Sequence, residues 1–165
     1  MAAQNFRLKN RVRHESRAMQ LYLDDLHVGQ RFTSGTHLIE EAEIKKFAAE
    51  FDPQPFHLDQ AAAEGTLFKG LAASGWHTAA IAMRLLVTGG LPLANGIIGF
   101  GGEIAWPKPT RPGDILRIDS EIVEIAPSRS KPQQGTVTVR NIMLNQRGET
   151  VYVLTAKLLV FRRPA

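Results

Sequence analysis

Residues 74–87, SGWHTAAIAMRLLV, decide the fold of this chain because they predict a helix with almost no polar face. Ser74 is a residue type that caps helix N-termini, and the GGLP stretch at 89–92 ends the helix. After the cap, the helix contains three polar residues: His77, Thr78 and Arg84. A helix that is apolar on nearly every side is buried on nearly every side. Other elements therefore have to surround it.

The C-terminal half of the chain supplies these surrounding elements. Four segments rich in β-branched and aliphatic residues, bounded by Gly, Pro or Asn, predict strands: Ile97–Trp106, Asp114–Ile125, Gly135–Leu144 and Val151–Phe161. Residues 146–149, QRGE, predict the hairpin loop between the last two strands. The three prolines of PKPTRPG, residues 107–113, predict a rigid connection. The sequence therefore predicts one α+β domain, with a curved antiparallel sheet wrapped around a long central helix.

Two further elements precede the central helix. Residues Arg31–Ile39 predict a strand, and Glu40–Phe51 predict an amphipathic helix. The apolar face of that helix consists of residues spaced at i, i+3, i+4 and i+7: Ile44, Phe47, Ala48 and Phe51. Pro53 and Pro55 end it, because a proline cannot donate an amide hydrogen bond and restricts the residue before it.

Composition excludes several functional classes. The chain has 165 residues and no cysteine, so disulfides, Cys-ligated zinc and thiol nucleophiles are ruled out. The formal net charge of +4 comes from residues 1–20, and we interpret this segment as a basic, flexible arm in front of a domain at 21–165. A basic arm can also bind nucleic acid, but no aromatic residues alternate with the basic ones and no nucleic-acid-binding motif follows. No apolar run spans a bilayer or forms a signal peptide, so we expect a cytoplasmic protein with no membrane or nucleic-acid partner.

The segment FDPQPFHLD, residues 51–59, carries the candidate chemistry. Asp52 and His57 lie five residues apart on a stretch stiffened by two prolines, which suits a carboxylate and an imidazole that act on one water. By spacing alone, another reading is stronger: the aspartate satisfies backbone amides at a helix end and the histidine lies on the surface.

A family resemblance reverses that preference. The segment resembles the signature Asp-x-Asn-Pro-x-His of the MaoC-like dehydratases, the (R)-specific enoyl-CoA hydratases, and appears here as Asp52, Gln54, Pro55 and His57. The family's small residue follows the histidine by 18 positions, which places it at Gly75. Residues 110–114, TRPGD, resemble the turn before a strand in these proteins. Gln54 replaces the usual asparagine, which puts the detailed geometry and the substrate range in doubt.

The resemblance implies a fold, an assembly and a reaction. It implies a hot-dog fold, a homodimer, and the reversible hydration of trans-2-enoyl thioesters of coenzyme A, or less readily of acyl carrier protein, to 3-hydroxyacyl thioesters. Asp52 and His57 would hold the water, and the Gly75 N–H would face the thioester carbonyl at the helix N-terminus. Ser74 would cap the helix and help at the carbonyl, while Gln54 would orient the site. We expect no metal and no cofactor other than the coenzyme A of the substrate.

Two alternative functions share the predicted fold. A hot-dog acyl-CoA thioesterase would release free thiol, and a non-catalytic acyl-CoA-binding module would have no need of Asp52 and His57 together. Of the remaining polar residues, His77 is expected to be a hydrogen-bonded core histidine. Any of three bases could meet the phosphates of coenzyme A: Lys108, Arg111 and Lys131.

Overall fold

The computed structural model describes residues 20–165. The predicted basic arm, residues 1–20, therefore lies outside the described residues except for Gln20. The described chain begins with a short 3-10 helix, η1 (Leu23–Asp25). Within residues 20–165, no helix has both the length and the apolar character that a bilayer crossing requires.

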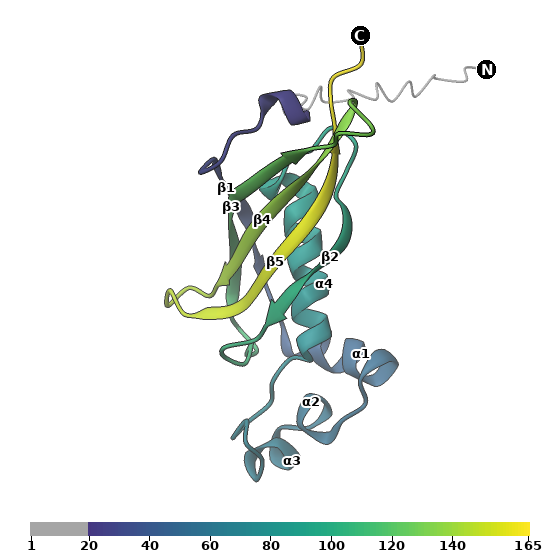
Figure 1. Cartoon of the computed structure of the whole chain (residues 1–165). Helices are drawn as coiled ribbons and strands as arrows, with labels where there is room; N and C mark the ends of the chain where they lie inside the picture. The colour runs from purple at the N-terminus through teal and green to yellow at the C-terminus, as the bar shows by residue number, and fades with distance from the viewer. Residues whose placement is uncertain (1–19) are drawn as a thin grey trace, which may run out of the picture.

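Five antiparallel strands form one curved sheet (Figure 1). The strands are β1 (Arg31–Leu38), β2 (Ile98–Ala105), β3 (Ile115–Pro127), β4 (Gln134–Leu144) and β5 (Thr150–Phe161). Their order across the sheet is β1-β3-β4-β5-β2, so β1 and β2 are the two edges. All five strands were predicted, with ends that agree within two residues, and the hairpin loop at 146–149 joins β4 to β5 as predicted.

The helix-facing side of the sheet forms the core. Alternate side chains in β3 and β4 are buried because successive residues of a strand point to opposite faces. They pack with buried residues of α4 (Gly75–Leu85), the predicted central helix, which lies against the sheet in Figure 1. The main contributors are Leu116, Ile118, Ile122, Val137, Val139, Met143, Ile81, Ala82 and Leu85. The predicted α+β architecture, a sheet wrapped around one helix, is confirmed.

The central helix is capped as predicted, but it is not buried on every side. The Ser74 hydroxyl accepts a hydrogen bond from the Trp76 amide, and a wider turn, η2 (Leu86–Gly90), extends the helix. Trp76, Met83 and Val87 are 63%, 44% and 58% exposed. The expectation of burial was wrong for this face, because the sheet ends at β2 and no element of the described chain covers the helix beyond that edge.

Three helices gather at the end of the molecule where α4 begins (Figure 1). They are α1 (Glu41–Phe51), α2 (Pro55–Leu58) and α3 (Gln60–Glu64). The first was predicted, but Phe51 is 65% exposed, so its expected place on the buried face was wrong: only Ile44 and Ala48 are fully buried. The α2 and α3 helices were not predicted, because four or five residues are too few to show a helical period.

Candidate active site

Asp52 is the C-terminal cap residue of α1, and two side chains hold its carboxylate. The Ser74 hydroxyl donates a 2.7 Å hydrogen bond to Oδ2, and the Gln54 amide donates one of 2.7 Å to Oδ1. The carboxylate therefore bonds to side chains from the start of α4 and from the α1–α2 connection. The alternative reading, an aspartate that satisfies backbone amides, does not describe this geometry.

His57 is a buried residue of α2 whose ring has a defined orientation. Its Nδ1 lies 2.7 Å from the main-chain carbonyl oxygen of Ala72. Because a carbonyl can only accept, Nδ1 must carry the proton and donate it. The other ring nitrogen, Nε2, then faces Asp52, 3.4 Å from Oδ2. The rings of Phe56 and Phe68 surround the imidazole, so it is not the surface histidine of the alternative reading.

Asp52 is held as a carboxylate. Burial raises its pKa, but the hydrogen bonds from Ser74 and Gln54, and the charge that His57 carries when it is protonated, lower the pKa by more, to below its usual value of 3.8. In the neutral histidine, Nε2 and Asp52 Oδ2 are both acceptors, and neither can donate to the other. A water molecule has two hydrogens and satisfies both acceptors at once. The pair is therefore arranged to hold one water by both of its O–H bonds.

Gly75 begins α4, so its N–H has no intrahelical acceptor and lies at the positive end of the helix dipole. Close packing also requires a small residue at this position. A Cβ at this position would lie 3.0 Å from Cε2 of Trp106, whose indole N–H donates a 2.8 Å hydrogen bond to the Gly75 carbonyl. Gly75 is therefore closely packed at the helix start, and the hydrogen bond from Trp106 occupies its carbonyl and not its amide.

These residues line one cavity of about 650 Å³. Asp52, Gln54, His57 and Gly75 lie in its wall, and Ser74 contacts it through Asp52. Much of the remaining wall is apolar or aromatic, and the main residues are Phe56, Leu67, Phe68, Ala73, Trp76 and Trp106. Sequence reasoning assigned no role to Phe68 or Trp106. Phe68 lies between the motif residues His57 and Gly75, and Trp106 ends a predicted strand; their aromatic side chains were the signal that could have marked them.

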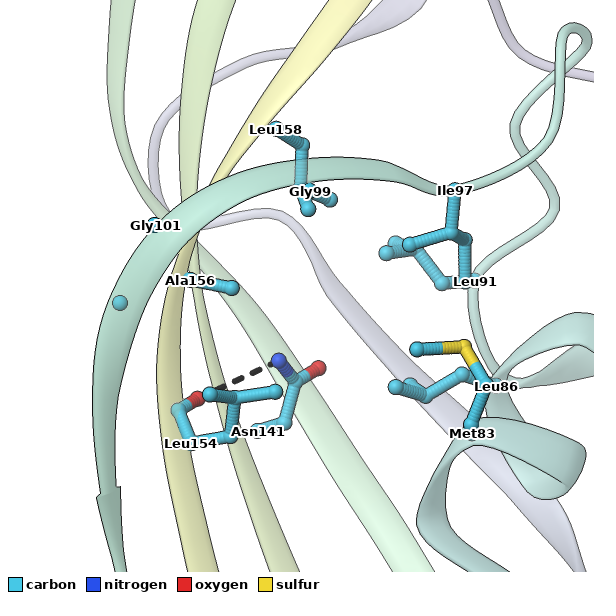
Figure 2. Close-up of a pocket in the computed structure, with 11 residues that line it drawn as sticks. Met83, Leu86, Leu91, Ile97, Gly99, Gly101, Asn141, Leu154, Ala156 and Leu158 are labelled. Atoms are coloured by element: carbon cyan, nitrogen blue, oxygen red, sulfur yellow. Dashed lines mark hydrogen bonds between the residues drawn. The ribbon is translucent and has the colours of Figure 1, made fainter. Parts of the chain in front are cut away.

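A second, smaller cavity lies between α4 and the edge of the sheet (Figure 2). Its volume is about 210 Å³, and its lining is almost wholly apolar. Met83 and Leu86 form the helix side, while Leu154 and Leu158 come from β5. Asn141 is the polar exception, and its amide donates to the Leu154 carbonyl at 3.2 Å.

The three bases expected near coenzyme A phosphates have different environments. Lys108 lies at the first cavity, where it pairs with Glu149 at 2.7 Å. Arg111 was a poor candidate, because its guanidinium donates to main-chain carbonyls instead of facing solvent. Lys131 lies in the β3–β4 turn and does not line the cavity.

His77 is buried as expected, although only one of its ring nitrogens has a partner. Nε2 lies 3.5 Å from a carboxylate oxygen of Glu43, and the ring stacks on Phe47 with centroids 4.5 Å apart. Nδ1 has no hydrogen-bond partner within the described residues. In residues 20–165, no group of three or more His, Cys, Asp and Glu side chains is placed to hold a metal ion.

The sheet wrapped around α4 defines a protein of the hot-dog class, and comparisons with known proteins specify it further. Residues 25–145 match the family described as the MaoC like domain. A MaoC-like dehydratase structure from Rhodospirillum rubrum is 62% identical, with a TM-score of 0.87 over 88% of this chain and 99% of that one. The R-hydratase PhaJ1 of Pseudomonas aeruginosa is 29% identical, with a TM-score of 0.69 over 87% and 88%.

A curated relative is similar at the level of sequence. The 3-hydroxybutyryl-CoA dehydratase of Methylorubrum extorquens is 30% identical over 116 residues, which are 67% of this chain and 69% of the relative. The chain therefore belongs to the MaoC-like family, as the resemblance at Asp52–His57 indicated. Membership of this family and the R-hydratase neighbour support a hydratase-type activity.

Proposed function

We propose that this protein catalyses the reversible addition of water to trans-2-enoyl-CoA thioesters, which yields 3-hydroxyacyl-CoA. The observation that carries the proposal is the placing of Asp52 Oδ2 and His57 Nε2, two acceptors 3.4 Å apart in the wall of one cavity. The proposed reaction needs no metal and no cofactor beyond the coenzyme A of the substrate.

In the proposed mechanism, the thioester carbonyl oxygen accepts a hydrogen bond from the Gly75 N–H. The water held by Asp52 and His57 gives one proton to the pair as its oxygen bonds to C3. The C2–C3 double-bond electrons move toward the thioester, and the developing negative charge on the carbonyl oxygen is stabilised at the start of α4. The pair returns the proton to C2 on the same face, so one water is added and the site is regenerated.

The acyl tail needs apolar space beyond the reacting carbons. The smaller cavity beside Met83 and Leu86 offers such space farther along the same helix. We therefore assign the tail to this cavity. The test is the ratio of kcat/KM for hexenoyl-CoA to that for butenoyl-CoA, which Met83→Trp should lower by filling the cavity.

The working unit in this proposal is a homodimer. The sheet leaves one face of α4 open, and its exposed edge strand β2 carries Ile98 and Phe100. Exposed apolar surface of this kind marks an interaction site, and an open edge strand can pair with another strand. A second copy of this chain would cover both features.

The proposed activity is tested with purified protein and a short trans-2-enoyl-CoA. We expect enone absorbance to fall while no free thiol appears. Release of thiol would instead identify the thioesterase, and binding of acyl-CoA with neither signal would favour the non-catalytic module. Each of those two outcomes contradicts the proposal.

A further inference from the structure

The segment between α3 and α4 forms one wall of the candidate site and also supplies the carbonyl that orients His57. Phe68 lines the cavity, and its ring centroid lies 5.8 Å from that of His57. Ala72, four residues later, accepts the hydrogen bond from Nδ1 of the same histidine. The backbone path of residues 68–72 therefore affects both the packing and the protonation pattern of the imidazole.

Arg111 holds this segment through its guanidinium group. One terminal nitrogen donates to the carbonyl oxygens of Gly70 and Leu71, at 2.8 and 3.1 Å, and the other donates to that of Phe68. The planar fork of a guanidinium can serve several acceptors in fixed directions, whereas a lysine ammonium acts as a point charge on a flexible stem. Three carbonyls on one guanidinium therefore fix the course of the backbone immediately before Ala72.

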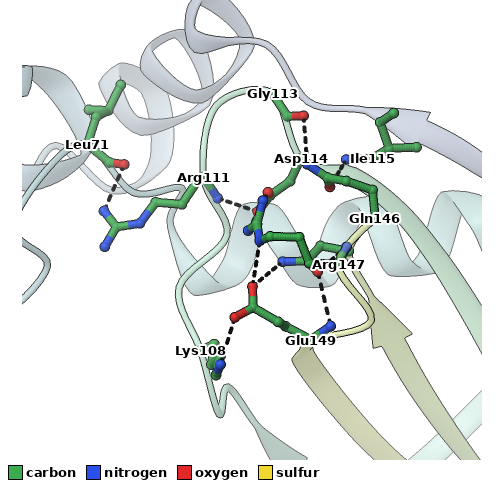
Figure 3. A network of polar contacts seen from close by, with 10 residues as sticks. Leu71, Lys108, Arg111, Gly113, Asp114, Ile115, Gln146, Arg147 and Glu149 are labelled. Carbon is green, nitrogen blue, oxygen red and sulfur yellow. Dashed lines mark hydrogen bonds and ion pairs between the residues drawn. The ribbon is translucent and has the colours of Figure 1, made fainter.

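Arg111 is itself anchored from the opposite side, as Figure 3 shows. Its main-chain N–H donates to Oδ2 of Asp114 at 2.8 Å, and the Asp114 side chain is almost completely buried. Arg147, from the β4–β5 loop, donates to the other oxygen of Asp114 at 3.1 Å. The guanidinium thus extends from the connection at residues 107–113, which is bonded to the β4–β5 loop, toward residues 68–72, which form no strand or helix.

Two main-chain hydrogen bonds complete the attachment. The Ala73 amide donates to the Thr110 carbonyl at 2.9 Å, and the Ala72 amide donates to the Phe56 carbonyl at 3.2 Å. Residues 110–111 and α2 therefore hold the Ala72 peptide between them. In this position its carbonyl accepts the hydrogen bond from Nδ1 of His57 at 2.7 Å.

We propose that Arg111 is a positioning residue for the reaction. By fixing residues 68–71, it sets the Ala72 carbonyl that keeps the proton of neutral His57 on Nδ1, and this leaves Nε2 free to accept from the water. The catalytic part of this inference rests on the proposed hydratase function. The part that concerns the tautomer of His57 is independent of that function.

The test compares Arg111→Gln and Arg111→Lys with the matched control Arg117→Lys. Arg117 is an exposed residue on the outer face of β3 that pairs with Asp119. Long-range ¹H–¹⁵N NMR of the imidazoles reports which nitrogen of His57 carries the proton, and steady-state kinetics separate kcat from KM. The wild type and the control should show neutral His57 protonated on Nδ1.

In both Arg111 variants we expect a mixture of tautomers at His57. We also expect kcat to fall by about tenfold or more, since a small misplacement of a catalytic group is costly, while KM changes by less than about threefold. Lysine should not rescue, because it cannot reproduce the three directed hydrogen bonds. If a folded variant keeps the wild-type tautomer, the proposal is overturned, whether kcat falls or not. If neither variant folds, the role is structural and the proposal is overturned as well.

The two proposals fail in different ways. If the wild type hydrates no enoyl thioester but the Arg111 variants still change the His57 tautomer, the proposed function is wrong and the positioning role stands. If the wild type is active but the Arg111 variants keep the wild-type tautomer of His57, the proposed function stands and the positioning role of Arg111 is wrong.

Discussion

Asp52 and His57 have complementary surroundings. The carboxylate is surrounded by donors, Ser74 and Gln54, while the imidazole has an acceptor, the Ala72 carbonyl. Donors around a carboxylate favour its charged form, and an acceptor at Nδ1 selects one tautomer of the ring. Gln54, at the position where the family motif has asparagine, donates to Oδ1 at 2.7 Å.

Removing either member of the pair should abolish most of the activity. We expect Asp52→Asn and His57→Ala each to lower kcat for enoyl-CoA hydration by about a hundredfold or more, the loss typical of a positioned acid–base group. Asp119→Asn, at a half-buried position on the outer face of β3, and His27→Ala, on the exposed surface, serve as controls and should retain the wild-type rate. Wild-type rates in folded Asp52→Asn and His57→Ala variants would show that the site is elsewhere.

Gly75 is expected to tolerate no side chain. In Gly75→Ala, the new Cβ would lie 3.0 Å from the Trp106 indole, so the indole and the start of α4 must move apart. We expect kcat/KM to fall by about tenfold or more as the amide donor is displaced. The control is Gly35→Ala, where a Cβ has no neighbour within 4 Å. Equal rates for both variants would show that the packing of Trp106 against Gly75 does not position the amide.

At the scale of elements, a cluster of polar residues joins the start of α1 to β1 and α4. Glu43 accepts from His37 at 3.0 Å and lies 3.5 Å from His77. Burial lowers the pKa of His77 below its usual value of 6.5; Glu43 raises it by less, and His37 lowers it further. The unfolded chain therefore binds this proton more readily than the folded protein does.

The lowered pKa of His77 makes the folded protein less stable as the pH falls. The stability linked to neutral His77 is complete above about pH 6.5 and is lost as the pH falls toward the lower pKa of the folded state. We expect His77→Phe, which keeps the stack on Phe47, to reduce the drop in Tm between about pH 8 and about pH 5.5. The exposed His27→Phe is the control. An unchanged drop in Tm in His77→Phe would show that His77 does not couple folding to pH.

Elements whose residues repeat with a clear period could be predicted from the sequence. The sheet and α4 follow from their apolar patterns, and the pairing of Asp52 with His57 follows from a short motif with a known family pattern. Contacts between distant segments could not be predicted. Arg111 meets Gly70 across 41 positions, and Trp106 meets Gly75 across 31, and no local pattern encodes either contact. For this reason Arg111 was named from the sequence only as one of three bases that could meet phosphates, and its contacts with carbonyls were not predicted.

At the scale of the whole molecule, the open face of α4 and the edge strand β2 both carry exposed apolar side chains. Pairing of two such surfaces would bury Trp76, Met83 and Phe100, which are exposed in the single chain. Aromatic residues and methionine are enriched at interfaces, which supports a second copy as the occupant.

A charge on this surface should therefore disrupt the assembly. We expect Phe100→Asp to shift the protein from dimer to monomer in light scattering, because the carboxylate would be buried without a partner. Val28→Asp places the same charge on an exposed side chain of another segment and should leave the mass unchanged. A wild-type protein that is monomeric at high concentration would contradict the assembly.

The central claim, that Asp52 and His57 direct one water to C3, is tested most directly with ¹⁸O-labelled water. The protein is incubated with trans-2-butenoyl-CoA, and the products are analysed by mass spectrometry. We expect the label in the C3 hydroxyl of an intact 3-hydroxybutyryl-CoA, and formation of this product about a hundredfold or more slower with Asp52→Asn. Label in a released carboxylate, or an Asp52→Asn variant that forms the labelled thioester at the wild-type rate, would contradict the claim.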